Sequence, residues 1–216
     1  MAKKSQKATK KSVYSVHPGV AMAQKWVAEL PEKTGRSLEQ WIEHVRKSGP
    51  DDEKARRTWL KEKYGLGTNT AWWIAKHASV GDVGIVDHDP DAYLAAAEQY
   101  VEAMFAGPKA GLVPIYDELL RMVFALGDDV RVCPCKTIVP FYRNHVIAEV
   151  KPATRTRIDF GFALGDTPVS GRLIDTGGLA KKDRITHRIP LASVDDIDDE
   201  VQHWLQTAYE RDGEKS

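Results

Sequence analysis

The residues from 136 to 191 alternate between apolar and charged side chains, and this alternation constrains the fold more than any other feature of the chain. Apolar residues occupy every second position in two neighbouring runs, Val146, Ala148 and Val150 and then Ile158, Phe160, Phe162 and Leu164. We call these positions the apolar parity and the positions between them the charged parity. A period of two is typical of a strand with one buried face. We therefore expect an antiparallel sheet that has one apolar face and one charged face.

The charged parity and the turns beside it contain the residues that we expect to bind a ligand. They are Lys136, Arg143, His145, Lys151, Arg155, Arg157, Arg184 and Arg188. In the run from 184 to 189 we expect Arg184, Thr186 and Arg188 to face outward. Residues 131–188 hold 11 Lys and Arg against five Asp and Glu, which favours an anionic partner. Neutralisation of this block by acidic segments within the fold is an equally good explanation.

Helical patterns that share five tryptophans precede the sheet. The first pattern starts at residue 21 with Met22, Trp26 and Leu30 four residues apart, and we expect Pro31 to end it. Further helices are expected at about 37–48, 51–64 and 68–75. The four helices predict a small, compact domain that is entirely helical.

The second helix has the clearest signature. Ser37 and Gln40 have the spacing of a capping box, and one apolar stripe follows, made of Leu38, Trp41, Ile42 and Val45. Because Trp41 lies at the centre of this stripe, we expect its side chain in the core of the helical domain.

Two stretches carry resemblances to known families. The segments KTGRSLEQWIEHVRKSGP, RRTWLKEKYGLGTN and AWWIAKHA resemble the family catalogued as domain of unknown function 4287, over about residues 21–79. This resemblance implies a helical fold and a domain boundary.

The segments KTIVPFYRNHVIAEVKPATRTRIDFGFAL, GRLIDTGG and DRITHRIPLASVDDIDDEVQHWLQTAY resemble the family catalogued as domain of unknown function 5655, over roughly residues 111–210. The resemblance implies a domain found beside nuclease-like or small helical domains, which favours a role with nucleic acid.

Together these patterns predict an α+β protein, in which a small all-helical N-terminal domain is followed by a C-terminal antiparallel sheet packed by helices. We expect a disordered basic leader at 1–20, the Trp-rich helical domain at 21–79, a linker at 80–89 and the α+β domain at 90–212. The leader has lysines but no apolar stripe, so it cannot offset the entropy lost on folding.

Composition narrows the choice of function and compartment. The chain has two cysteines, too few for a disulfide scaffold and without the spacing of a metal site, so we expect reduced thiols, no metal and no cofactor. We find no apolar run long enough to cross a bilayer and no apolar core of a signal peptide. We therefore expect a cytoplasmic protein without a membrane partner.

Three classes of function are weighed. The first is a binding protein whose basic sheet face takes nucleic acid or another anionic ligand. The second is an enzyme or small-molecule binder with a pocket between sheet and helices, using Tyr142, His145 or His187. A nuclease-type metal site is disfavoured, because Glu149 and Asp159 are too few acids for it. The third is a protein-interaction module that exposes tryptophans, the candidates being Trp26, Trp41, Trp59, Trp72 and Trp73. We favour the first class and expect no catalytic residues.

Overall fold

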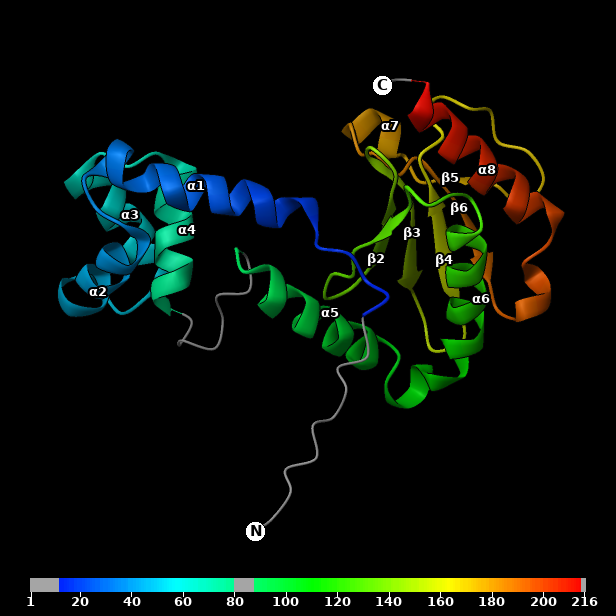
Figure 1. Ribbon diagram of the computed structural model, residues 1–216, viewed down its shortest axis with the longest axis horizontal. Helices are drawn as coiled ribbons and strands as arrows, with labels where there is room; N and C mark the ends of the chain where they lie inside the picture. The colour runs from blue at the N-terminus through cyan, green and yellow to red at the C-terminus, as the bar shows by residue number, and fades with distance from the viewer. Residues whose placement is uncertain (1–11, 80–87, 215–216) are drawn as a thin grey trace, which may run out of the picture. The chain divides into compact units, whose positions relative to one another are not determined.

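The computed structural model describes residues 12–79 and 88–214. The described residues form two compact units, one of residues 16–93 and one that combines residues 12–15 with residues 94–214 (Figure 1). Residues 1–11 of the predicted leader (1–20) and residues 80–87 of the predicted linker (80–89) lie outside the described residues.

The first unit consists of helices, as the sequence predicts. They are α1 (Pro18–Thr34), α2 (Leu38–Ser48), α3 (Glu53–Tyr64) and α4 (Thr68–Ser79). Ser37 and Gln40 close the expected capping box at the start of α2. Trp41 is 1% exposed and lies in the core of this unit, which confirms the prediction for its side chain.

The first helix differs from its prediction in two ways. Pro31 does not end α1, which continues to Thr34; Pro31 falls close to the C-terminal end, where few backbone hydrogen bonds can be lost. Met22 is 74% exposed, and the buried side chains of this helix are those of Val20, Ala23 and Leu30. The helix therefore turns a slightly different face inward from the one that the spacing of Met22, Trp26 and Leu30 predicts.

The second unit is an antiparallel sheet with helices, so the α+β prediction is confirmed. Its helical segments are α5 (Pro90–Met104), η2 (Gly107–Leu112), α6 (Val113–Phe124), α7 (Gly178–Lys181), η3 (Val194–Asp196) and α8 (Asp199–Gly213). Its strands are β1 (Arg131–Val132), β2 (Val139–Tyr142), β3 (Val146–Pro152), β4 (Ile158–Phe162), β5 (Ile174–Asp175) and β6 (His187–Leu191), in the order β1-β2-β3-β4-β6-β5. None of the described helices has the length and hydropathy needed to cross a bilayer.

One face of the sheet forms the core with α6 and α8, which lie on the same side of the sheet in Figure 1. Most of the predicted apolar parity fills this core, since Ala148, Val150, Phe160 and Phe162 are 0% exposed. Val146 is an exception: it is only partly buried, and Ile147 of the opposite parity is 0% exposed, next to a register shift between β2 and β3. Leu119 of α6 and Leu205 of α8 belong to the same core and are also 0% exposed. The burial of whole apolar side chains is the main contribution to the stability of such a unit.

The segment just before α1 contacts the second unit. The Ser15 amide donates a hydrogen bond of 2.8 Å to the Val132 carbonyl of β1. The Tyr14 ring packs against the sheet core, and its hydroxyl lies 3.3 Å from that of Tyr116. Burial raises the pKa of Tyr14. The expected disordered leader, 1–20, therefore overlaps with described residues that pack, from Tyr14 to the start of α1.

We expect Tyr14→Ala to lower the free energy of unfolding by about 1–2 kcal/mol, because it removes ring burial and a hydrogen bond. Chemical denaturation followed by circular dichroism measures the loss. Val13→Ala is the control, since Val13 is 57% exposed and its truncation should change stability by less than about 0.5 kcal/mol. Equal stability of the two variants would show that residues 12–15 do not stabilise the sheet.

Candidate functional site

The strand register sorts the predicted ligand-binding residues into two groups at opposite ends of the sheet. Val139 pairs with Val150 and Ile158 with Leu191, so the turn that contains Lys136 and the connection at 153–157 lie at the same end. We call this the basic end; it contains Lys136, Lys151, Arg155 and Arg157. The other end, which we call the tethered end, contains Arg143, His145 and Arg184. Arg188 lies between them, opposite Gly161.

Asp212 of α8 neutralises most of the tethered end. Its carboxylate is 2% exposed and accepts hydrogen bonds from the backbone amides of Asn144 and His145, each at 2.8 Å. His145 Nδ1 lies 3.0 Å from Asp212 Oδ1, and the Arg184 guanidinium pairs with the same oxygen. Burial alone would raise the pKa of Asp212, but the hydrogen bonds from His145 and the charge of Arg184 outweigh it, so the pKa lies below its usual value.

The remaining arginine of the tethered end is also tied to α8. Arg143 Nε lies 2.7 Å from Asp129 Oδ2, and Arg143 Nη1 donates a hydrogen bond of 3.0 Å to the Tyr209 carbonyl. The guanidinium carbon stands 4.1 Å from the centre of the Tyr209 ring. These contacts fasten the β2–β3 turn to the last helix. Structural ion pairing therefore accounts for the charges of Arg143, His145 and Arg184.

At the basic end most of the basic side chains are exposed to solvent. Within the described residues, the side chains of Lys136, Lys151 and Arg155 are exposed and make no ion pair or hydrogen bond. Arg157 Nε and Arg188 Nη1 approach the same oxygen of Asp159, at 3.0 and 3.2 Å. The side chains of Arg157 and Arg188 are 42% and 31% exposed. Ion pairs that are this open to water add little to the stability of the fold, and both guanidinium groups keep donors for a ligand.

A further cation lies at this end that the alternation pattern cannot reveal. Lys109 Nζ donates a hydrogen bond of 2.7 Å to the carbonyl of Pro152, the last residue of β3. Lys109 belongs to η2, 43 residues away along the chain, so only the folded structure brings it to the basic end. Its ammonium group keeps two further protons for other acceptors.

Glu149 is the second carboxylate on the charged parity. Burial raises the pKa of Glu149, although the charge of Lys151 acts in the opposite direction. The neutral form of Glu149 is therefore favoured more than in a free carboxyl group.

The segment before β6 departs from its predicted parity. Thr186 is 2% exposed rather than outward-facing, because β6 begins only at His187 and the preceding residues fold over this end of the sheet face. Ile185 packs on Gly161, where a Cβ atom would lie 2.6 Å from Ile185 Cγ2. The Thr186 hydroxyl accepts a hydrogen bond from the Leu164 amide and lies 2.9 Å from His187 Nδ1.

The residues considered for an enzyme pocket lie in different environments. His187 is 3% exposed and bonded to Thr186, as expected of a core histidine. His145 is exposed and bonded to Asp212, while burial raises the pKa of Tyr142 to about 12. Burial also raises the pKa of the Cys133 thiol to about 12, which disfavours a reactive thiolate. Within the described residues, no group of three metal-ligating side chains occurs.

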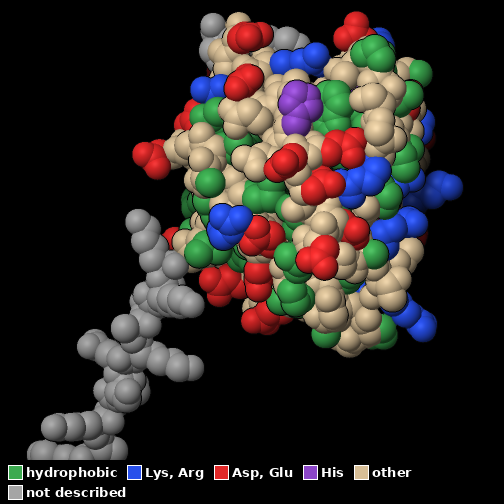
Figure 2. All heavy atoms as spheres, turned by 90° about the vertical axis from the view of Figure 1, so that its right-hand side faces the viewer, with side chains coloured by type: hydrophobic (Ala, Val, Ile, Leu, Met, Phe, Trp, Pro, Cys, Tyr) green, Lys and Arg blue, Asp and Glu red, His purple; other side chains and the backbone are tan. Residues whose placement is uncertain are grey.

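The face of this unit that α6 and α8 cover has a different character from the basic end. Figure 2 shows acidic side chains scattered over it, with fewer basic ones. The acids come from α6, η3 and α8, as Asp117, Glu118, Asp195, Asp196, Asp199, Glu200 and Glu210. The neutral chain therefore presents a basic end of its sheet and an acidic helical face.

Comparison with known proteins identifies two families along the chain. The model of Domain of unknown function (DUF5655) matches residues 101–212, and that of Domain of unknown function (DUF4287) matches residues 22–79. These two matches confirm both resemblances read from the sequence. No curated protein and no solved structure matches the chain.

Proposed function

We propose that this chain, which belongs to the family described as Domain of unknown function (DUF5655), binds nucleic acid through the basic end of its sheet. The observation that carries the proposal is the contrast between the two ends. Lys136, Lys151 and Arg155 are exposed and make no ion pair or hydrogen bond among the described residues, whereas the arginines of the tethered end already pair with carboxylates.

Charge density favours a polyanion over a small monoanion. Five cations, Lys136, Lys151, Arg155, Arg157 and Arg188, come from one turn, two strands and the connection between β3 and β4. Glu149 of β3 and Asp159 of β4 are the carboxylates on the charged parity of these two strands. Neighbouring strands lie about 4.8 Å apart and alternate residues about 6.7 Å apart, so the cations cover a surface rather than one point. A phosphate backbone offers charges at comparable intervals.

The test changes Lys151 and Arg155, the two exposed cations at the β3–β4 connection. In the full chain, Lys151→Glu with Arg155→Glu should weaken binding of fluorescein-labelled single-stranded or duplex DNA at least tenfold at low salt, as measured by fluorescence anisotropy. For duplex DNA, the slope of log K against log salt should become shallower by about 2, because each phosphate contact contributes about 0.9. The melting temperature should stay close to that of the wild type, since both side chains are exposed and, among the described residues, neither makes an ion pair or hydrogen bond.

Lys54→Glu with Lys61→Glu is the matched control. Both lysines are exposed on α3, and this double variant changes the net charge by the same amount. An equal loss of binding in the control would show that total charge, not the basic end, determines affinity. Unchanged binding in the Lys151 and Arg155 variant would refute the placement of the site.

The interaction-module alternative receives less support from the positions of the tryptophans. Trp72 is 37% exposed, whereas Trp41 is buried and Trp26, Trp59 and Trp73 are partly buried. A pocket between sheet and helices is also less favoured, because apolar side chains of both layers fill the core there.

We propose a cytoplasmic location for this activity. Cys133 and Cys135 are both free thiols in the structure, and free thiols persist in a reducing compartment.

A further inference from the structure

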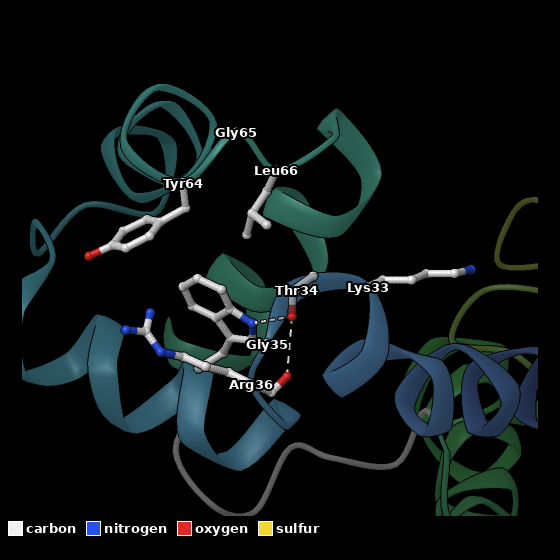
Figure 3. Close-up of a pocket in the computed structure, with 8 residues that line it drawn as sticks. Lys33, Thr34, Gly35, Arg36, Tyr64, Gly65 and Leu66 are labelled. Atoms are coloured by element: carbon white, nitrogen blue, oxygen red, sulfur yellow. Dashed lines mark hydrogen bonds between the residues drawn. The ribbon is translucent and has the colours of Figure 1, made fainter.

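The helical unit contains a hollow of about 440 Å³ that the proposed nucleic-acid site does not use. It is lined by Lys33, Thr34, Gly35, Arg36, Trp41, Tyr64, Gly65 and Leu66. Figure 3 shows Arg36 and Tyr64 on one side of it, with Leu66 pointing inward and Lys33 extending away. A second hollow of about 420 Å³ shares Gly35 and Arg36 and adds Gln40, Glu43, His44 and Lys47. Volumes of this size are typical of small-molecule sites.

Arg36 lies where the two hollows meet, and its guanidinium is held by rings rather than by acids. The guanidinium carbon stands 4.7 Å from the centre of the Trp41 ring and 5.5 Å from that of Tyr64. Among the described residues, the Arg36 guanidinium makes no hydrogen bond and no ion pair. An arginine stacked in this way keeps its donors available in a planar fork.

The backbone on both sides of Arg36 is fixed, so the guanidinium is presented in a preorganised position. Gly35 closes α1 in the left-handed region at φ 76°, and Ser37 begins α2 through its capping box. The Thr34 hydroxyl lies 3.2 Å from the Arg36 carbonyl and accepts a hydrogen bond of 2.8 Å from Trp41 Nε1. A donor fixed before binding loses less entropy when a ligand arrives.

The electrostatic surroundings favour a doubly charged ligand. Lys47 lines the second hollow, and Lys63 stands 5.4 Å from the Trp59 ring and 5.8 Å from the Tyr64 ring. Burial, followed by the charges of Arg36 and Lys63, lowers the pKa of His44, in accord with a positive potential. Among the described residues, Glu43 is the one carboxylate that lines either hollow. A phosphate monoester fits several cations better than a carboxylate, which carries a single charge.

We propose that the helical unit binds a phosphate monoester at Arg36, with the guanidinium making a bidentate contact to the phosphate and Lys47 supplying a second charge. The phosphate can come from a small molecule, such as a nucleotide, or from the phosphorylated 5′ end of an oligonucleotide. Both sources share the same chemistry at Arg36. This site is separate from the basic end of the sheet and does not depend on it.

The test titrates the full chain with inorganic phosphate, with a nucleoside 5′-monophosphate and with oligonucleotides that carry or lack a 5′-phosphate. Nuclear magnetic resonance follows the Arg36 Nε and Trp41 Nε1 signals. We expect saturable shifts with inorganic phosphate and with each compound that bears a terminal phosphate, whereas acetate at the same ionic strength should cause none. The preferred source is the one that binds most tightly. No saturable shift with any of the phosphate compounds, or an equal shift with acetate, would overturn the proposal.

Two substitutions of Arg36 distinguish a contact that needs the planar guanidinium group from one that needs only a positive charge. The Trp41 signal is the readout. Arg36→Gln should weaken phosphate binding at least tenfold, and Arg36→Lys should weaken it about three- to tenfold because it keeps the charge and loses the planar fork. Arg57→Gln is the control, since Arg57 pairs with Glu53 on α3 and lines neither hollow. Binding in Arg36→Gln equal to that of the control would contradict the assignment. The Lys151→Glu, Arg155→Glu variant should retain this binding, which separates the two proposals.

Discussion

Trp41→Ala should lower the free energy of unfolding of the helical unit by about 3–5 kcal/mol, the usual cost of removing a large aromatic side chain from a core. The indole is 1% exposed and packs among the helices of the unit. The substitution also removes the hydrogen bond from Trp41 Nε1 to Thr34 and the edge-to-face contact with Tyr64 at 5.1 Å. A small domain has a total stability of about 5–15 kcal/mol, so this loss would be a large share of the stability of the unit.

Differential scanning calorimetry of the full chain measures the effect, because the two units can unfold in separate transitions. Trp72→Ala is the matched control. Trp72 is 37% exposed and contacts Lys76 and Trp73 at the surface, so its truncation should cost about 1 kcal/mol or less. A loss below about 1 kcal/mol for Trp41→Ala would contradict its place in the core.

The main elements of the fold could be predicted from local patterns. Alternation placed Ala148, Val150 and Phe160 in the core, and the spacing of Ser37 and Gln40 predicted the start of α2. Each of these signals depends on residues a few positions apart, where backbone geometry alone determines which side chains share a face. The structure confirms these assignments because tertiary packing agrees with local preference.

The charged face could not be resolved in the same way. Parity placed Arg184 and His145 with the ligand-binding residues, but their common partner Asp212 is 28 and 67 residues away along the chain. Thr186 shares the parity of Arg188 but is buried, and its hydroxyl accepts a hydrogen bond from the Leu164 amide. A period of two indicates which face a side chain takes, but it does not indicate what covers that face.

The hollow at Arg36 shows the same limit in the helical unit. Its lining comes from the end of α1, the start of α2 and the end of α3. Thr34 and Tyr64 are 30 residues apart in sequence, and no motif relates them. The capping box could be predicted from the sequence, whereas the stacking of Arg36 on two rings follows only from how the helices pack.

Asp212→Asn should lower the free energy of unfolding of the sheet unit by about 2–4 kcal/mol at neutral pH, because it removes a buried charged acceptor that several donors share. Asp212 has four donors, from the backbone of Asn144 and His145 and from the side chains of His145 and Arg184. Asp129→Asn is the control. Asp129 also pairs with an arginine, but its side chain is 48% exposed, so the loss should be below about 1 kcal/mol.

The difference in the free energy of unfolding between the wild type and Asp212→Asn should become smaller as the pH falls. The folded-state pKa of Asp212 lies below its usual value, so ionised Asp212 stabilises the fold at all pH values above the unfolded-state pKa of about 3.9. This contribution is lost as the pH falls from about 4 through the folded-state pKa. Urea denaturation at pH 7 and at about pH 3 should therefore show a smaller gap at the lower pH. A gap that is the same at both values would show that Asp212 does not bind its partners as a carboxylate.

The same variant also tests which end of the sheet binds nucleic acid. Loss of the Asp212 charge removes the partner that neutralises Arg184, so the tethered end becomes more positive. At a temperature where Asp212→Asn is folded, DNA binding should therefore be equal to that of the wild type or slightly stronger. If binding were instead lost in the folded variant, Asp212 would be positioning residues that contact the nucleic acid, and the site would lie at the tethered end.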